Sequence, residues 1–369
     1  MTTGAGGETS VTVTSHDQAS HTLSEILSQP QCWSACLGQL AQSGGLIAAV
    51  ELAKPRAEWV FVGCGSSYYL AIVAAATFTE LGLPARSIPA SEIMLYPELS
   101  LPKGREYCPV LISRSGLTSE VLRAARLLEQ ECDLRTIAIT CADSSPLESL
   151  STATLKMLAA DEQSTVMTRS FTSMLLGLQY LGAAVSGRED FRSDLLELPV
   201  QVKPLVELMP ERLRGFAHSH SFADYIFLAQ GALFGVANEA MLKVMESSCS
   251  YAQVFHTLEF RHGPKAIVGP ATLMTFFLSE SSYQHELEVL EEMKRLGAAT
   301  LVIGNTVGAP ARKSADLVIE LGLHVQECAR LAAHAIWGQL LGVYAGIRKG
   351  LNPDSPNNLT RVVVLDGHH

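Results

Sequence analysis

The sequence predicts an α/β protein made of two tandem units, each with a doubly wound parallel sheet. Short apolar runs rich in Val, Ile and Leu alternate with helical patterns, as expected for parallel strands that helices bury on both faces. The alternation occurs twice, and its spacing repeats: Leu111 follows Phe61 by 50 positions, and Phe276 follows Ile226 by 50. In each half the next strand lies 26 positions further on. One duplicated unit explains both intervals.

The first unit follows a helical segment that starts at residue 22. Its apolar runs predict four strands, over residues 59–63, 109–113, 135–140 and 154–159. Helical patterns between and after them predict helices over residues 68–81, 119–131 and 144–151. The stretch 168–219 is mostly helical in pattern and links this unit to the next.

The second unit repeats the plan with strands over residues 225–230, 271–279, 299–305 and 315–321, and helices over 235–248, 283–297 and 328–350. A chain of 369 residues exceeds the size at which one core usually stops growing. We therefore divide it into a first domain over 21–200 and a second over 201–369. Residues 1–20 are rich in Thr, Ser and Gly, which predicts a disordered tail.

Composition excludes several functional classes. The net charge is −10 without any dense Lys or Arg run, which argues against nucleic-acid binding. No apolar run reaches the ~18 residues that a membrane span needs, and no secretory signal is visible. The eight cysteines are scattered, and Cys32 and Cys36 have no second pair at metal-ligand spacing. We expect a cytoplasmic protein with free thiols and neither a metal nor a cofactor.

Two hydroxyl-rich turns follow predicted strands: "GCGSS" at 63–67 and "SRSGLTSE" at 113–120. Ligands of open parallel sheets bind where strands give way to helices, and a helix N-terminus there suits a phosphate. One such turn is more often a simple helix cap. Two turns on strands that can be neighbours favour an anion site. Neither turn fits a dinucleotide or P-loop motif, so a small phosphate monoester is the predicted ligand.

The stretches "VGCGSSYYLA", "ISRSGLTSEVL" and "EFRHGPKAIV" resemble the sugar isomerase (SIS) family, from about Thr22 to the end of the chain. The resemblance implies two flavodoxin-like SIS units. It is strongest to the isomerase half of glutamine–fructose-6-phosphate transaminase and to aminosugar-phosphate deaminases and ketose isomerases. The phosphate-binding residues that it implies are Ser66, Ser67, Ser113, Arg114, Ser115 and Thr118. Arg114 replaces the usual Gln, and either adds charge to the cradle or pairs with an acid.

A group of ionisable residues lies in the second unit. Glu239, Lys243 and Glu246 share one face of a predicted helix. Such a triple is commonly a solvated ladder, but this helix is otherwise apolar, which favours a cleft. The resemblance makes Glu246 the isomerase base, Lys243 its neighbour, His262 the residue that opens the sugar ring and Glu259 an acid of the same loop. It also implies a homodimer with shared active sites, in which His262 reaches the neighbour's site.

These residue types suit aldose–ketose chemistry. One carboxylate can move a proton between two adjacent carbons. A histidine of near-neutral pKa can protonate the ring oxygen, and a lysine can balance the charge of an enediolate.

The C-terminal stretch "NPDSPNNLTRVVVL" resembles the family's tail, which closes over the sugar. Arg361 stands where the transaminase has its Schiff-base lysine. Arginine stays protonated and cannot form an imine, so we expect an ionic role for Arg361 in the site. Only about twenty residues precede the resemblance, and Thr2 follows Met1 where a glutaminase has its cysteine. We therefore expect no release of ammonia from glutamine by this chain.

We predict an aminosugar-phosphate isomerase/deaminase that interconverts a glucosamine 6-phosphate-like substrate with fructose 6-phosphate and ammonia. Alternatives are another phosphosugar aldose–ketose isomerase, for example of tagatose 6-phosphate, or a fructosamine-6-phosphate deglycase. A non-catalytic phosphosugar sensor is a third, because SIS units also serve in regulators. Two units that fill the chain, with both Glu246 and His262 present, favour an enzyme.

Overall fold

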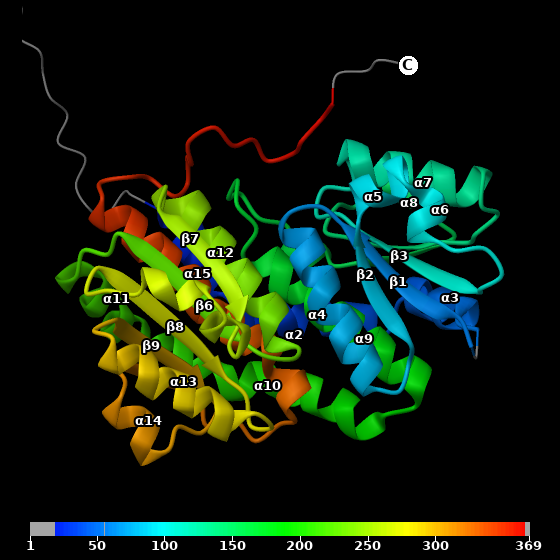
Figure 1. The fold of residues 1–369 in the computed structure, drawn as a ribbon. Helices are drawn as coiled ribbons and strands as arrows, with labels where there is room; N and C mark the ends of the chain where they lie inside the picture. Colours follow the sequence, from blue (N-terminus) through cyan, green and yellow to red (C-terminus); the bar gives the residue numbers. More distant parts are fainter. Residues whose placement is uncertain (1–18, 55, 366–369) are drawn as a thin grey trace, which may run out of the picture.

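The computed structural model describes residues 19–54 and 56–365. It contains two parallel sheets flanked by helices, as the sequence predicts, and each sheet has five strands (Figure 1). The first sheet has the order β2-β1-β3-β4-β5 and the second the order β10-β9-β8-β6-β7. Read in the opposite direction, the second order is β7-β6-β8-β9-β10. It equals the first order when five is added to each strand number. The duplication inferred from spacing is therefore confirmed in the topology.

The first unit contains one strand more than the sequence predicts. Its strands are β1 (Glu58–Gly63), β2 (Ala85–Pro89), β3 (Tyr107–Ile112), β4 (Ile137–Thr140) and β5 (Ala153–Lys156). Its helices are α4 (Ser66–Glu80), α5 (Ala90–Leu95), α6 (Pro97–Ser100), α7 (Ser119–Gln130) and α8 (Pro146–Ser149). The strand that the apolar pattern misses is β2, an edge strand of sequence "ARSIP" with only one buried residue.

The second unit differs from expectation in the same way. Its strands are β6 (Asp224–Ala229), β7 (Tyr251–His256), β8 (Thr272–Leu278), β9 (Ala299–Gly304) and β10 (Leu317–Glu320). Its helices are α12 (Leu233–Ser248), α13 (Tyr283–Arg295) and α14 (Ala309–Lys313), with 3₁₀ turns η2 (Glu259–Arg261), η3 (Pro264–Ile267) and η4 (Glu327–Arg330). The edge strand β7 also escapes the apolar pattern, because only one of its six residues is buried.

Helices outside the two sheets join the units. They are α1 (Ser20–Leu27), α2 (Gln29–Leu40), α3 (Gly44–Leu52), α9 (Arg169–Ser186), α10 (Glu189–Leu208), α11 (Pro210–Ser219) and α15 (Leu331–Arg348), with the 3₁₀ turn η1 (Leu158–Ala160). The boundary proposed between residues 200 and 201 falls within α10. Most of the tail predicted over 1–20 lies outside the described residues, and Ser20 already belongs to α1. One hydrophobic core contains Phe61 of the first sheet, Phe227 of the second and Trp337 of α15.

Close packing of α15 against α12 fixes the helix that carries Glu239, Lys243 and Glu246. Glycines recur every four residues on α15, and two of them face the backbone of α12. A Cβ on Gly342 would lie 2.6 Å from the Lys243 carbonyl oxygen, and one on Gly346 would lie 2.1 Å from that of Ser247. Only glycine permits this approach, so the packing of α15 sets the position of the Lys243 backbone.

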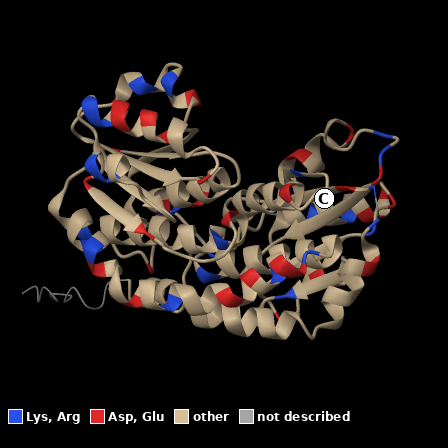
Figure 2. Ribbon diagram, turned by 90° about the horizontal axis from the view of Figure 1, so that it is seen from below, with Lys and Arg blue, Asp and Glu red and all other residues tan. Residues whose placement is uncertain are grey.

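Charge is dispersed over the molecule. Figure 2 shows acidic and basic residues interspersed over both units instead of gathered by sign. None of the helices in the described ranges is both long and apolar enough to cross a bilayer.

Candidate active site

The two hydroxyl-rich turns lie side by side at the carboxyl ends of β1 and β3, which pair in parallel. Gly65 precedes α4 with φ 54°, and Gly116 lies in the second turn with φ 64°. Neither α4 nor α7 has a side-chain cap, so the hydroxyls do not serve the capping role that was the simpler alternative. Two helix N-termini without side-chain caps therefore face the same edge of the sheet. The Ser119 N–H at the start of α7 donates to the Val363 carbonyl of the C-terminal segment at 3.4 Å.

Hydrogen bonds within the second turn hold its shape. The hydroxyls of Ser113 and Thr118 lie 3.0 Å apart, and the Gly116 N–H donates to Ser113 Oγ at 3.1 Å. The Leu117 N–H donates to Ser115 Oγ at 3.2 Å, which leaves the Ser115 proton free to bind a ligand. Ser113 is thus a scaffold of the turn, whereas Ser115 presents a donor.

A pocket of about 180 Å³ lies over these turns. Its walls come from four stretches, residues 64–67, 112–118, 165–167 and 360–363, together with Glu246 of α12. Of the residues predicted for the site, it brings together Ser66, Ser67, Arg114, Ser115, Thr118, Glu246 and Arg361. The C-terminal segment therefore runs back from α15 to the first unit, as Figure 1 shows in red.

The carboxylate of Glu246 is held beside the phosphate turns by Lys243. The Lys243 ammonium donates to Glu246 Oε2, donates to Ser66 Oγ at 3.1 Å and lies 3.4 Å from Glu239 Oε1. Lys243 and Glu239 are fully buried, whereas 19% of the Glu246 side chain is exposed. One lysine thus links the first turn of α4 to the carboxylate that opens into the pocket.

Electrostatics distinguish the two carboxyl groups. Burial raises the pKa of Glu239 to about 8, although the neighbouring Lys243 opposes the shift. Burial alone would lower the pKa of Lys243, but Glu239 and Glu246 outweigh it and raise that pKa. Lys243 therefore stays charged, and the carboxylate with access to a ligand is Glu246.

Arg114 takes the second of its two predicted alternatives, pairing with an acid. Its Nη1 lies 3.0 Å from Glu162 Oε1, and the pair is buried, with 6% and 0% of the side chains exposed. The same guanidinium donates to the carbonyls of Ser164, Thr165 and Arg361 at 3.2, 2.9 and 2.9 Å. The N–H donors of Arg114 therefore bind the 164–165 loop and the C-terminal segment, instead of pointing toward the two hydroxyl-rich turns.

His262 and Glu259 are not brought to this pocket. Both are exposed and follow β7 in the second unit, at η2 and its end. A single chain therefore contains the turns, Glu246 and Lys243 in one place and the His262 loop in another.

Sequence reasoning missed the 162–167 loop. Glu162 accepts from the Arg114 side chain and from the N–H and hydroxyl of Thr168, and Thr165 and Met167 line the pocket. The only signal was an acid followed by hydroxyl residues, "DEQST", in a stretch without periodicity. Among the described residues, no three metal-ligating side chains come together.

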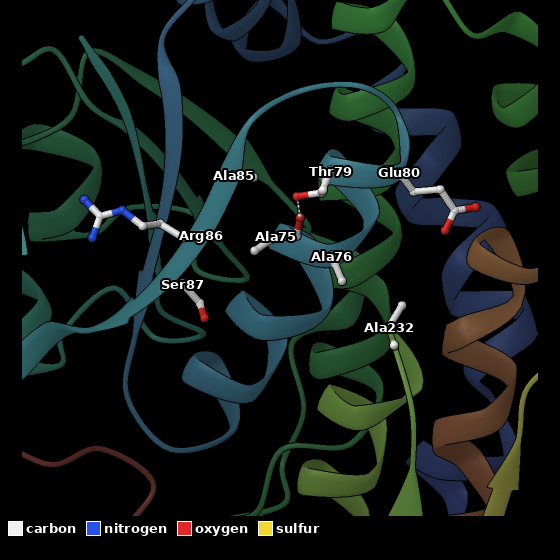
Figure 3. Close-up of a pocket in the computed structure, with 9 residues that line it drawn as sticks. Ala75, Ala76, Thr79, Glu80, Ala85, Arg86, Ser87 and Ala232 are labelled. Carbon is white, nitrogen blue, oxygen red and sulfur yellow. Dashed lines mark hydrogen bonds between the residues drawn. The ribbon is translucent and has the colours of Figure 1, made fainter. Parts of the chain in front are cut away.

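A wider hollow of about 560 Å³ lies between α4, β2 and the turn before α12 (Figure 3). Alanines 75, 76, 85 and 232 form much of its lining, and the side chains of Arg86 and Glu80 extend to opposite sides of it. Arg86 is occupied by Glu58, at 3.0 Å, and by the Ser100 carbonyl. This hollow lacks convergent polar groups, so the smaller pocket is the better candidate site.

The chain belongs to the SIS domain family, which its sequence matches over residues 51–184 and 224–332, more than half of its length. Glutamine–fructose-6-phosphate aminotransferase (isomerizing) of Pyrobaculum aerophilum is 27% identical over 355 residues, covering 93% of this chain and 57% of the relative. The chain thus spans little more than half the length of that aminotransferase. A Streptomyces coelicolor protein provisionally named D-galactosamine-6-phosphate deaminase is 26% identical, covering 92% of both chains.

Solved structures agree with this assignment. Glucosamine-6-phosphate deaminase from Thermotoga maritima superposes with a TM-score of 0.74 at 28% identity, covering 93% of this chain and 99% of the other. Tagatose-6-phosphate ketose/aldose isomerase from Escherichia coli gives a TM-score of 0.82 at 21% identity over 94% of this chain and 96% of the other, a likeness of fold. The relatives of more than 25% identity are thus named as an isomerizing aminotransferase and as aminosugar-phosphate deaminases.

Proposed function

We propose that this chain is an aminosugar-phosphate isomerase/deaminase that interconverts a glucosamine 6-phosphate-like substrate with fructose 6-phosphate and ammonia. One observation carries the proposal: a lysine-held carboxylate, Glu246, opens into the same small pocket as two uncapped helix N-termini. The names of the two deaminase relatives support an aminosugar substrate.

In the proposed reaction, the phosphate binds the N–H groups at the starts of α4 and α7, with hydroxyls of Ser66, Ser67, Ser115 and Thr118 around it. This anchors the sugar with its C1–C2 end toward α12. Glu246 removes a proton from one of these carbons and returns it to the other. Lys243 balances the negative charge that develops on the enediolate oxygen. In the deaminating direction this transfer from C2 to C1 gives an imine at C2. Water adds to that carbon and ammonia leaves, so C2 becomes the ketone; in the reverse direction ammonia adds to the ketone and water leaves.

A panel of phosphosugars tests the proposal. Each of glucosamine 6-phosphate, galactosamine 6-phosphate and tagatose 6-phosphate is incubated with the protein, and ammonia and the ketose or aldose product are measured. Ammonia together with a ketose from an aminosugar phosphate is the expected result. Isomerisation of tagatose 6-phosphate without ammonia release from any aminosugar would instead favour the plain isomerase alternative, which uses the same proton transfer.

Ser115→Ala is expected to weaken the binding of a sugar phosphate about tenfold or more, because it removes a hydrogen bond to a charged group. Isothermal titration with fructose 6-phosphate measures the change. Ser281→Ala is the matched control, because Ser281 follows β8 where Ser115 follows β3. Equal affinities for wild type and Ser115→Ala would place the phosphate elsewhere.

We further propose a homodimer in which His262 of each chain completes the partner's site, because the exposed His262 loop is separate from the Glu246 pocket. Glu246→Gln and His262→Ala are each expected to be inactive. Mixing them should restore up to about a quarter of the sites if exchange is random. Subunit exchange is verified by differently tagged chains. Complete inactivity of verified mixed dimers would refute the shared site.

A further inference from the structure

Two arginines border the phosphate pocket, and their surroundings differ. Arg114 is buried, ion-paired with buried Glu162 and hydrogen-bonded to three carbonyls. The Arg361 side chain is 44% exposed, and its guanidinium has one acidic partner, Asp161, which is itself 60% exposed. A buried pair is costly to break, whereas an exposed pair contributes little and exchanges partners easily. Only Arg361 is therefore available to an incoming anion.

The backbone of Arg361 is held by hydrogen bonds, whereas, within the part of the chain that the structure describes, its side chain is held only by the exposed ion pair with Asp161. Arg114 Nη2 donates to the Arg361 carbonyl at 2.9 Å, which keeps this residue in the pocket wall. Upstream, Asp354 accepts from the N–H and hydroxyl of Thr22 at 2.8 and 2.6 Å. Downstream, the Leu365 N–H donates to Ser119 Oγ at 3.0 Å, at the start of α7. The tail is thus tied on both sides of Arg361.

The charges of the residues that line the pocket also favour a change of partner by Arg361, from Asp161 to a bound phosphate. Among the described residues lining it, Arg114 and Arg361 are the cations and Glu246 is the acid. Lys243 lies behind Ser66 and is held by two carboxylates. A phosphate dianion on the two turns would therefore find one cationic group able to move toward it.

We propose that Asp161 is the resting partner of Arg361 and competes with the substrate's phosphate for its guanidinium. In the empty pocket Arg361 pairs with Asp161. When a phosphate monoester occupies the turns, the guanidinium leaves Asp161 and binds the phosphate, while Arg114 keeps the Arg361 backbone in place. Asp161 thereby sets affinity without touching the substrate. This inference rests on the proposed phosphate site.

A double-mutant cycle with inorganic phosphate as the titrant tests the competition. Asp161→Asn is expected to tighten phosphate binding about two- to fivefold, the range an exposed ion pair allows. Arg361→Gln is expected to weaken it by about tenfold, because a charge-assisted hydrogen bond is lost. In the Arg361→Gln background, Asp161→Asn should then have no effect beyond the error of the titration.

Comparing Asp161→Asn in the wild-type protein and in Arg361→Gln separates competition for the guanidinium from simple repulsion between Asp161 and the phosphate. If Asp161 only repelled the phosphate, its removal would tighten binding equally with and without Arg361, and equal effects would overturn the inference. An unchanged affinity in Asp161→Asn would overturn it as well. Both results leave the proposed phosphate site intact. Failure of the wild-type protein to bind phosphate at all would instead overturn the site and this inference together.

Discussion

Glu246→Gln is expected to lower kcat by about 10²–10⁴-fold, the usual contribution of a general base, while phosphosugar binding survives. The substitution keeps the size of the side chain and a carbonyl oxygen that Lys243 can still contact, but it removes the basic oxygen. Binding should survive because the phosphate donors lie on the turns before α4 and α7, in the other unit.

Two measurements separate catalysis from binding in this variant. Proton exchange at C2 in deuterated water, followed by NMR, reports the base directly, and a calorimetric titration reports binding. Glu259→Gln is the comparison, because Glu259 is the other acid that the resemblance implies. Undiminished exchange in Glu246→Gln would assign the base elsewhere, with Glu259 the next candidate. Binding without exchange or ammonia release in the wild-type protein would favour the sensor alternative.

The fold could be predicted because its central strands are buried on both faces. Such strands leave uninterrupted apolar runs, and their fixed spacing exposed the duplication. The edge strands β2 and β7 left no such run, because each has one buried residue, whereas the opposite edge strands β5 and β10 keep two buried residues out of four. Each pairs on one side only, so polar residues such as Arg86 and Gln253 are tolerated there. The sequence analysis therefore missed the equivalent strand in both units.

The local part of the site could be predicted for a related reason. Parallel strands end at one edge of a sheet, so turns that follow β1 and β3 in sequence must meet in space. The helical spacing of Lys243 and Glu246 likewise fixes their contact. The partner of Arg114 could not be predicted, because Glu162 lies 48 positions away on an irregular loop. The Arg361 carbonyl, 247 positions away, leaves no sequence pattern either.

Arg114→Gln is expected to destabilise the protein by about 3–5 kcal/mol, because it leaves the buried Glu162 carboxylate without its counter-charge. Three carbonyls, on the 164–165 loop and at Arg361, lose a shared donor group at the same time. Urea unfolding, followed by circular dichroism, measures the free energy of unfolding. Arg214→Met, which breaks an exposed ion pair with Glu211, is the control and should change it little.

Adding Glu162→Gln to Arg114→Gln distinguishes a stranded charge from lost hydrogen bonds. The double variant buries two neutral amides, so it should recover part of the stability that Arg114→Gln loses. It should not recover the tail, because a glutamine cannot reach Glu162, the 164–165 loop and the Arg361 carbonyl together. Proteolysis near residues 359–365 should therefore stay faster than in wild type while the unfolding midpoint rises. Equal stability of the single and double variants would show that the Glu162 charge is not the source of the loss.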